Sequence, residues 1–228
     1  LLVPEMGVRF SKKGRYFQSQ STLSIKGNLR SVSESDRIAL GGIDVMSQSR
    51  RLSLDEKLRF ELGQWYSRIA SSEVSDSVKK HFMLFQFHAS LALRSGRHLP
   101  QYQYLLGGTG SVRGYPEYPA AGDNGYRFSA EYYLPLCEIP AFSGQGEGEL
   151  SLVPFLDFGQ TFVKNPKSWE SDKSLLGAGF GLQFSLPGGG RLRIDFAKPF
   201  REIRTNGSIL DGTNSSDGRI HASLNWPF

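Results

Sequence analysis

The chain has 228 residues, of which 39% are hydrophobic and 12% aromatic, and its formal net charge at pH 7 is +5. This composition is too apolar for a disordered chain, and its uncharged stretches fall short of the roughly 18 apolar residues of a transmembrane helix. A single cysteine, Cys137, excludes a disulfide framework and any cysteine-based metal centre. Hydropathy leaves a membrane β-barrel open, because alternation brings the mean hydropathy of a strand close to zero.

Apolar and polar residues alternate with a period of two along most of the chain, which is typical of β-strands with two different faces. The alternation predicts nine strands, at residues 4–11, 16–30, 52–66, 82–95, 125–136, 149–162, 174–186, 190–200 and 217–228. Most of these runs exceed the five or six residues usual in soluble proteins. About 9–11 tilted residues cross a bilayer, so the lengths favour a transmembrane barrel. A soluble sandwich or lipocalin-like barrel remains an alternative.

The predicted strand 52–66 also carries helical signals. Ser53 to Glu56 has the form of a capping box, and a helix would place several apolar residues on one face: Leu54, Leu58, Leu62, Trp65 and Ile69. Strict alternation from Lys57 to Leu62 and the topology favour a strand. We therefore predict a strand here, with the helix as the alternative.

Long and shorter connections largely alternate, as they do in barrels with turns on one rim and extended loops on the other. With a periplasmic C-terminus, the long connections 31–51, 96–124, 163–173 and 201–216 are all extracellular. Cys137 is predicted to lie in the turn that follows residue 136. Many basic residues share the parity that would face the lumen: Arg9, Lys26, Lys57, Arg59, Arg94, Arg127, Arg191, Arg193 and Arg219.

The longest connection contains a glycine-rich segment from Leu106 to Glu117. Its glycine spacing fits neither the dinucleotide-binding fingerprint nor a Walker A loop. A solvated loop has no reason to carry three large apolar side chains, which here are Val112, Tyr115 and Tyr118. We therefore expect this loop to fold back into the protein.

In the strand 149–162, the alternation places Ser151, Val153, Phe155 and Asp157 toward the lumen, and Leu152, Leu156 and Phe158 toward lipid. An acid among aromatic residues needs a partner, because an unpaired charge in a partly dry setting is costly. An arginine on an inserted loop would supply a bidentate partner. Solvation of Asp157 by lumen water is the alternative.

The motif Val112-Arg113-Gly114-Tyr115, followed later by Phe155-Leu156-Asp157-Phe158-Gly159, resembles the paired motifs of the BamA-type outer-membrane superfamily. The context from Leu106 to Glu117, then a strand with Arg127 and Glu131, looks most like its two-partner secretion transporters, the TpsB branch, which are haemolysin and haemagglutinin activation-secretion proteins.

This resemblance implies an all-β fold, a 16-stranded antiparallel transmembrane β-barrel with a long extracellular loop folded inward. Residues 1–228 are then expected to form its C-terminal portion of about nine strands, with the POTRA domains and first strands absent from this chain. The resemblance also implies that Arg113 pairs with Asp157, with Gly114, Tyr115 and Gly159 beside them. Arg127 and Glu131 are candidate lumen contacts.

The C-terminal run Arg219–Phe228 alternates and ends in an aromatic residue. It resembles the signal by which the barrel assembly machinery recognises outer-membrane barrels, and its key residues are then Trp226 and Phe228. A final strand that merely ends in Phe is the alternative.

The resemblance implies a protein of the bacterial outer membrane, surrounded by outer-membrane lipids, that exports a partner exoprotein to the cell surface. An assembly factor similar to BamA or TamA, which inserts other barrels, and a passive pore are the alternatives. We expect neither an enzyme nor a cofactor: His81, His88, His98 and His221 lack metal-ligand spacing, and no Gly-x-Ser-x-Gly motif occurs. No basic run with interleaved aromatics indicates nucleic-acid binding.

Overall fold

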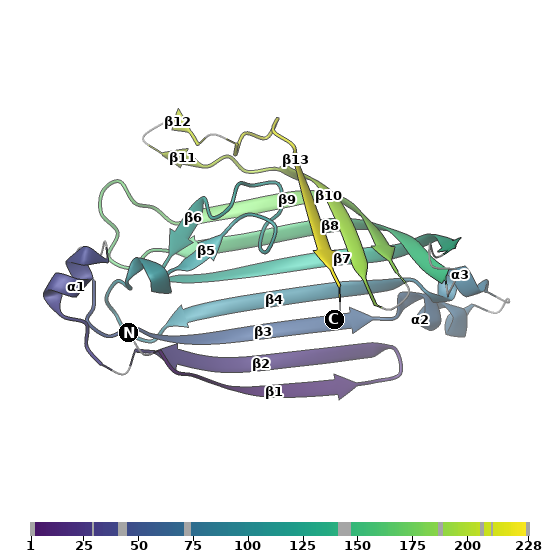
Figure 1. Ribbon diagram of the computed structural model, residues 1–228, viewed down its shortest axis with the longest axis horizontal. Coiled ribbons are helices and arrows are strands. Elements are labelled where there is room, and N and C mark those ends of the chain that lie inside the picture. The colour runs from purple at the N-terminus through teal and green to yellow at the C-terminus, as the bar shows by residue number, and fades with distance from the viewer. Residues whose placement is uncertain are drawn as a thin grey trace.

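The computed structural model describes residues 3–28, 30–40, 45–70, 74–140, 147–186, 189–205, 208–210 and 212–226. These residues form one large antiparallel sheet of nine strands (Figure 1). In their order across the sheet, the strands are β1 (Glu5–Lys13), β2 (Phe17–Gly27), β3 (Arg50–Phe60), β4 (Phe82–Ala92), β7 (Asn124–Pro140), β8 (Glu147–Phe162), β9 (Lys173–Ser185), β10 (Arg191–Pro199) and β13 (Arg219–Asn225). Sheet order follows chain order, so the sheet is an up-and-down meander, as in antiparallel membrane barrels.

Shorter elements lie in the connections. β5 (Tyr104–Leu106) pairs with β6 (Ala120–Gly122), and β11 (Arg204–Thr205) pairs with β12 (Ser208–Ile209). The helices are α1 (Glu34–Ala39), α2 (Leu62–Ile69), α3 (Asp76–Lys79) and one turn of 3-10 helix, Pro100–Tyr102. None of the helices in the described ranges has the length and apolar character needed to cross a membrane.

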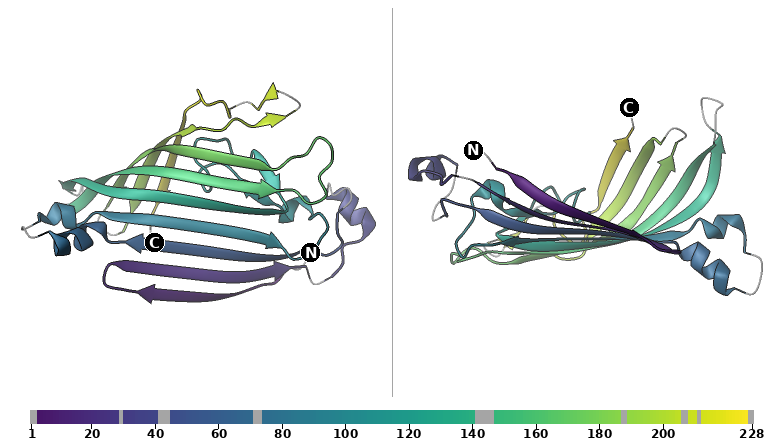
Figure 2. Two further views of the ribbon diagram at one scale, coloured as in Figure 1. Left: turned by 180° about the vertical axis from the view of Figure 1, so that it is seen from behind. Right: turned by 90° about the horizontal axis from the view of Figure 1, so that it is seen from below.

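The sheet is curved, so it has a concave and a convex face. Figure 2 (right) shows the C-terminal strands, green to yellow, turning up out of the plane of the other strands. Successive side chains of a strand point to opposite faces, and β8 separates accordingly. Phe155 and Asp157 are buried on the concave side, whereas Leu156 between them is 47% exposed on the convex side. The predicted division of this strand into two faces, with Phe155 and Asp157 on one and Leu156 on the other, is therefore confirmed.

The convex face carries an uncovered band of large apolar side chains. Each of the nine strands contributes to it: Met6, Val8, Phe10, Leu23, Ile25, Leu54, Leu91, Phe128, Leu156, Phe180, Phe196, Ile220 and Leu224 are all exposed there. In a soluble sandwich, the apolar face of a sheet packs against a second sheet. A barrel wall in a membrane instead turns its apolar band outward to lipid.

The prediction of a strand across the whole of 52–66 is wrong beyond residue 60. Strand β3 ends at Phe60, and helix α2 begins at Leu62. The alternation up to Phe60 and the helical spacing of Leu62, Trp65 and Ile69 were both genuine, but they belong to successive elements. The helix packs tightly on α3, since a Cβ on Gly63 would lie 1.8 Å from the Val78 carbonyl oxygen.

The prediction that Cys137 lies in a turn is also wrong. Strand β7 continues to Pro140, and Cys137 is an exposed residue of that strand opposite Leu150. The register of the β7–β8 pair shifts between Pro135 and Cys137. Such an irregularity accommodates a proline, which cannot donate to the ladder, and lets the strand continue.

Candidate functional site

A long loop, residues 93–123, connects β4 to β7 and folds over the concave face. The pairing of Tyr104 with Gly122 and of Leu106 with Ala120 holds the two halves of the loop together. Strands β5 and β6 lie against β8, and β5 also lies against β7. The residues between them, 107–119, therefore form the end of the loop, which is closed off by this strand pair and is here called the loop tip.

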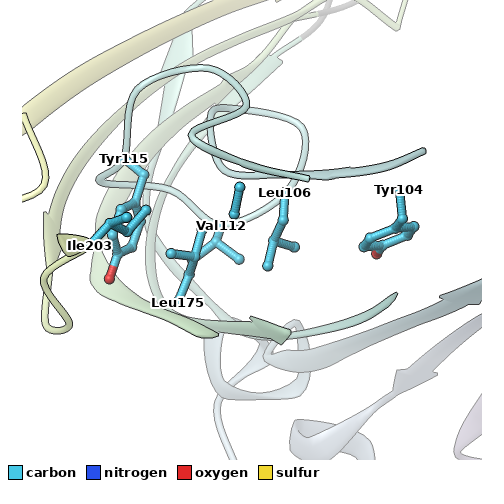
Figure 3. Packing of buried hydrophobic residues seen from close by; sticks show 7 residues of the cluster. Tyr104, Leu106, Val112, Tyr115, Leu175 and Ile203 are labelled. Carbon is cyan, nitrogen blue, oxygen red and sulfur yellow. The ribbon is translucent and has the colours of Figure 1, made fainter. Parts of the chain in front are cut away.

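Apolar side chains fix the loop against the sheet (Figure 3). The cluster combines Tyr104, Leu106, Val112, Tyr115 and Ala120 of the loop with Leu175 of β9 and Ile203 of the connection after β10. Burial of a large apolar side chain contributes roughly 1.5–3 kcal/mol. The loop thus folds back onto the protein, as expected, and an apolar cluster shared with β9 and the connection after β10 holds it there.

Tyr118 departs from that expectation. Its side chain is 57% exposed, and its backbone has a positive φ of 55°. The backbone here is in the left-handed conformation, which a non-glycine residue rarely adopts. Tyr118 is therefore exposed and is not part of the buried cluster.

Two glycines allow the loop tip to contact the sheet backbone to backbone. Gly114 has φ +94°, and a Cβ on it would lie 2.7 Å from the Lys198 carbonyl carbon of β10. A Cβ on Gly177 of β9 would lie 2.0 Å from the carbonyl oxygen of Arg113. Both positions require glycine, because a side chain would separate the tip from the sheet.

The Arg113 side chain enters a site made by the concave face. Its Nε and Nη2 donate to the two carboxylate oxygens of Asp157 at 2.7 and 2.8 Å, a bidentate arrangement. Its Nη1 donates to Glu131 at 2.7 Å and lies 3.5 Å from Asp195. The backbone N–H of Arg113 also donates to Asp157, at 3.1 Å. The structure thus brings together Arg113 and Asp157, the two residues of the paired motifs.

Two further contacts complete the surroundings of the guanidinium group. Arg113 Nη2 lies 3.3 Å from Ser129 Oγ, and the guanidinium carbon lies 3.5 Å above the centre of the Phe155 ring. We call the set Ser129, Glu131, Phe155, Asp157 and Asp195 the arginine socket. Asp157 is completely buried, and Arg113 and Glu131 are nearly so. The socket is drawn from β7, β8 and β10.

The charges of the socket keep Arg113 ionised. Burial by itself lowers the pKa of the guanidinium, but the hydrogen bond to Asp157 and the negative charges around it raise the pKa above its ordinary value. Removal of one partner from a buried ion pair costs about 3–5 kcal/mol, because the remaining charge is left uncompensated. The arginine side chain is therefore a strong attachment of the loop tip.

A second arginine, Arg193 of β10, binds two of the carboxylates of the arginine socket. It donates to the two carboxylate oxygens of Glu131 at 2.9 and 3.1 Å, and its Nε donates to Asp195 at 2.8 Å. The Tyr133 hydroxyl donates to Glu131 at 2.7 Å. These hydrogen bonds hold the carboxylates of Glu131 and Asp195 in position. The alternation gave Arg193 a lumen-facing position, but nothing in the sequence predicted its partners.

The remaining candidates lie around the socket. Arg127 Nη1 donates to the carbonyl oxygen of Gly110 in the loop tip, and Glu131 is a socket residue. Both therefore contact the inserted loop. Gly159 makes room for the loop, since a Cβ there would lie 2.6 Å from Leu106.

The last strand touches the same loop tip and ends near the turn between β9 and β10. The Gly114 N–H lies 3.4 Å from His221 Nε2 of β13. Trp226 is 49% exposed, and its ring covers Gly190. Phe228, the other residue of the predicted assembly signal, lies outside the described residues. The signal itself stays a prediction.

A polar cluster at the base of the loop was not expected from the sequence. Asp123 is completely buried, and its carboxylate accepts from the backbone N–H groups of His98 at 2.6 Å and Lys164 at 2.8 Å. Arg51 Nη2 lies 3.3 Å from the Asp123 carbonyl oxygen. Nearby, Arg97 forms a bidentate ion pair with Glu170 at 2.6 and 2.8 Å. The long loop is thereby tied to the β8–β9 connection. Isolated polar residues in loops follow no period, so no pattern in the sequence indicated this cluster.

Comparisons with known proteins agree with this architecture. The Omp85 superfamily domain model matches residues 56–221. Among solved structures, CdiB from Escherichia coli matches with a TM-score of 0.66 and 18% sequence identity, over 96% of this chain and 35% of that chain. This chain thus spans about a third of the length of that structure. No curated protein sequence matches the chain.

The family match covers most of the chain and includes Asp157 and the loop that carries Arg113. The structural likeness independently supports a partial β-barrel wall made of long antiparallel strands. The apolar convex band fits the same setting. The chain belongs to the Omp85 superfamily and is part of a β-barrel protein of the bacterial outer membrane.

Proposed function

We propose that the protein is an outer-membrane transporter that moves a partner exoprotein from the periplasm to the cell surface. In this proposal, residues 1–228 form the C-terminal portion of the barrel, and the transporter belongs to the two-partner secretion branch. Membership of the Omp85 superfamily and the fold shared with CdiB support it. So does the Leu106–Glu117 sequence context, which led to the same expectation.

The observation that carries the proposal is the attachment of the long loop. The loop tip lies on the concave face through one buried ion-pair site, an apolar cluster and close backbone contacts, without joining the ladder of the large sheet. Release of a few side-chain contacts would therefore move it and leave the strand pairing intact. A plug with this kind of attachment suits a pore that must open for a large cargo.

The wall beside the loop tip suits a hydrated, unfolded chain. A cavity of about 1230 Å³ lies on the concave face, and polar and charged groups from several strands line it. The basic residues in its lining include Lys57, Arg59, Arg127 and Arg191. Polar and charged groups of this kind can solvate the backbone of an unfolded polypeptide, beside the few apolar side chains, such as Phe82 and Leu84, that also line the cavity.

We further propose that transport proceeds without catalysis by this chain. Folding of the exoprotein outside the cell would remove the unfolded form from the pore and so draw the remainder through. In this account the partners are the exoprotein, the surrounding lipids and the assembly machinery that inserts the barrel itself. No bound cofactor has a role.

The test compares surface and secreted proteins in cells with the gene intact, deleted, or replaced by the variant Arg113→Ala. Loss of one large exoprotein on deletion, with other outer-membrane barrels unchanged, supports export. Arg113→Ala should change the secreted amount of the same exoprotein, because it frees the loop tip, and unchanged secretion would show that this attachment has no part in export. Arg30→Ala, which alters an exposed arginine in another loop, serves as the matched control and should leave secretion unchanged.

A general fall in outer-membrane barrels on deletion would contradict the export proposal and indicate an assembly factor similar to BamA or TamA. A passive pore would show neither effect, since its deletion would alter only the uptake of small solutes. The three functions thus give three different outcomes in one experiment.

A further inference from the structure

The arginine socket satisfies every donor of one guanidinium group. An arginine side chain has five N–H donors in a planar fork. In the socket, the Arg113 donors meet acceptors on Asp157, Glu131, Asp195 and Ser129, and the flat face of the group lies on Phe155. All of these acceptors are side chains of β7, β8 and β10, so the socket does not depend on the loop for its shape.

The charges show what happens to the socket when the loop tip leaves. Three carboxylates, Glu131, Asp157 and Asp195, face two guanidinium groups, those of Arg113 and Arg193. Arg193 remains with Glu131 and Asp195. Asp157, which is completely buried, would keep only the Ser129 hydroxyl, which donates to it at 2.6 Å. The emptied socket would carry two uncompensated negative charges, an unfavourable state in a partly dry site.

The location of the socket would make it accessible to a chain in the pore once the loop tip has moved. The cavity on the concave face is lined by Glu131, Asp157 and Asp195, together with Arg113 itself. Much of the surrounding wall is basic, with Lys57, Arg59 and Arg191. The socket is therefore an acidic point in a largely basic lining, and a cation on a passing chain would be attracted to this point.

The geometry favours arginine over lysine. A lysine ammonium group has three donors on one atom, so it cannot form the bidentate pair with Asp157 and reach Glu131 and Ser129 at the same time. It also lacks the flat surface that stacks on Phe155. The socket thus selects a planar guanidinium group.

We propose that the arginine socket is a binding site for an arginine side chain of the transported polypeptide, which takes the place of Arg113 when the loop tip moves. This inference rests on the proposed export function. In this way the cargo itself stabilises the open position of the loop, because it neutralises the socket that the loop has left. Cargo segments that contain arginine would open the pore more readily than segments without it.

The test uses the full-length protein in detergent with an empty socket, made by Arg113→Ala. Binding of a fluorescent, unfolded peptide with a single arginine is compared with binding of the same peptide with citrulline or lysine at that position. Citrulline keeps the shape of arginine but removes its charge. The arginine peptide should bind at least about tenfold more tightly than either, because hydrogen bonds to charged groups are the strong ones. The double variant Arg113→Ala with Asp157→Asn should lose this preference.

A second measurement covers the case in which the double variant does not fold. Methylguanidinium, added to Arg113→Ala, should increase the protection of the socket strands β7 and β8 from hydrogen exchange, whereas methylammonium at equal concentration should not. Equal binding of the three peptides, or equal effects of the two small cations, would overturn the inference. If deletion of the gene abolishes export but the peptides bind equally, the inference alone fails. If the arginine preference holds but no exoprotein depends on the gene, the proposed function alone fails.

Discussion

The Tyr115 hydroxyl oxygen lies 2.7 Å from the carbonyl oxygen of Arg201, the second residue after the end of β10. The same oxygen accepts from the backbone N–H groups of Leu176 at 3.2 Å and Arg201 at 3.1 Å. One hydroxyl group of the loop tip therefore joins the ends of two strands. Burial raises the pKa of this phenol, so it remains a neutral donor across the physiological pH range.

Tyr115→Phe should loosen the loop tip without disturbing the apolar cluster. The ring would remain in place, but partly buried backbone groups at Leu176 and Arg201 would lose a hydrogen-bond partner, which costs about 0.5–1.5 kcal/mol for each bond. Hydrogen exchange of residues 107–118 should become faster. Tyr118→Phe removes a hydroxyl from the same loop on an exposed side chain, so it should leave the exchange unchanged. Equal effects of the two variants would show that the Tyr115 hydroxyl does not hold the tip.

Gly177→Ala, a substitution in β9 and not in the loop itself, should displace the loop tip. The new Cβ would overlap the Arg113 carbonyl oxygen, which lies 2.0 Å from its ideal position. Overpacking of this kind costs about 1–3 kcal/mol. Protection of residues 107–118 from hydrogen exchange should fall, while the β8–β9 pairing remains protected.

Gly110→Ala provides the matched control for that variant, because a Cβ at Gly110 has nothing within 4 Å. It should leave the protection of the tip as it is. If Gly177→Ala gives the same protection as Gly110→Ala, the close contact between the tip and β9 does not hold the loop.

The base of the loop should also depend on Asp123. An asparagine there offers one oxygen acceptor, so Asp123→Asn can keep the bond from the His98 N–H or the Lys164 N–H, but not both. We expect a loss of about 1–3 kcal/mol of local stability and faster hydrogen exchange at residues 96–104 and 163–166. Asp172→Asn, which alters an exposed residue that accepts from the Val163 N–H, should act only on the β8–β9 connection. Unchanged exchange at residues 96–104 in Asp123→Asn would rule out this attachment.

The loop base should weaken in mild acid because of His98. Burial, aided by the positive charge of Arg51, lowers the pKa of His98 from 6.5 to about 4. Because the unfolded loop binds a proton at higher pH than the folded loop, stability rises with pH between about 4 and 6.5. It should therefore fall as the pH decreases through that window, as measured by the heat-unfolding midpoint of the full-length protein.

His98→Gln removes the titrating group and should flatten this part of the pH profile. The exchange of residues 96–104, corrected for the intrinsic effect of pH, provides a local measurement of the same effect. An identical pH profile in the wild-type protein and His98→Gln would assign the acid sensitivity to other groups.

The strands could be predicted from the sequence because a sheet with one apolar face imposes a period of two on its residues. The pairing of Arg113 with Asp157 could be predicted for a different reason, because each residue lies in one of two recognisable motifs. The other residues of the arginine socket could not be predicted. Alternation places Asp195 and Arg193 on the lumen side, but it does not say how far the sheet curves, and curvature decides that β10 reaches Glu131 of β7. The change from strand to helix after Phe60 depends on α2 packing against α3, a contact that no short window of sequence contains.

Since the socket takes residues from β7, β8 and β10, its construction has an order in time. Asp157 and Ser129 come together as soon as one hairpin forms, but Asp195 joins them only after two more strands have paired. Arg113 precedes all of them in the chain, and its set of partners is complete only when β10 has paired. The complete set of carboxylates around this arginine therefore exists only in a wall that extends as far as β10.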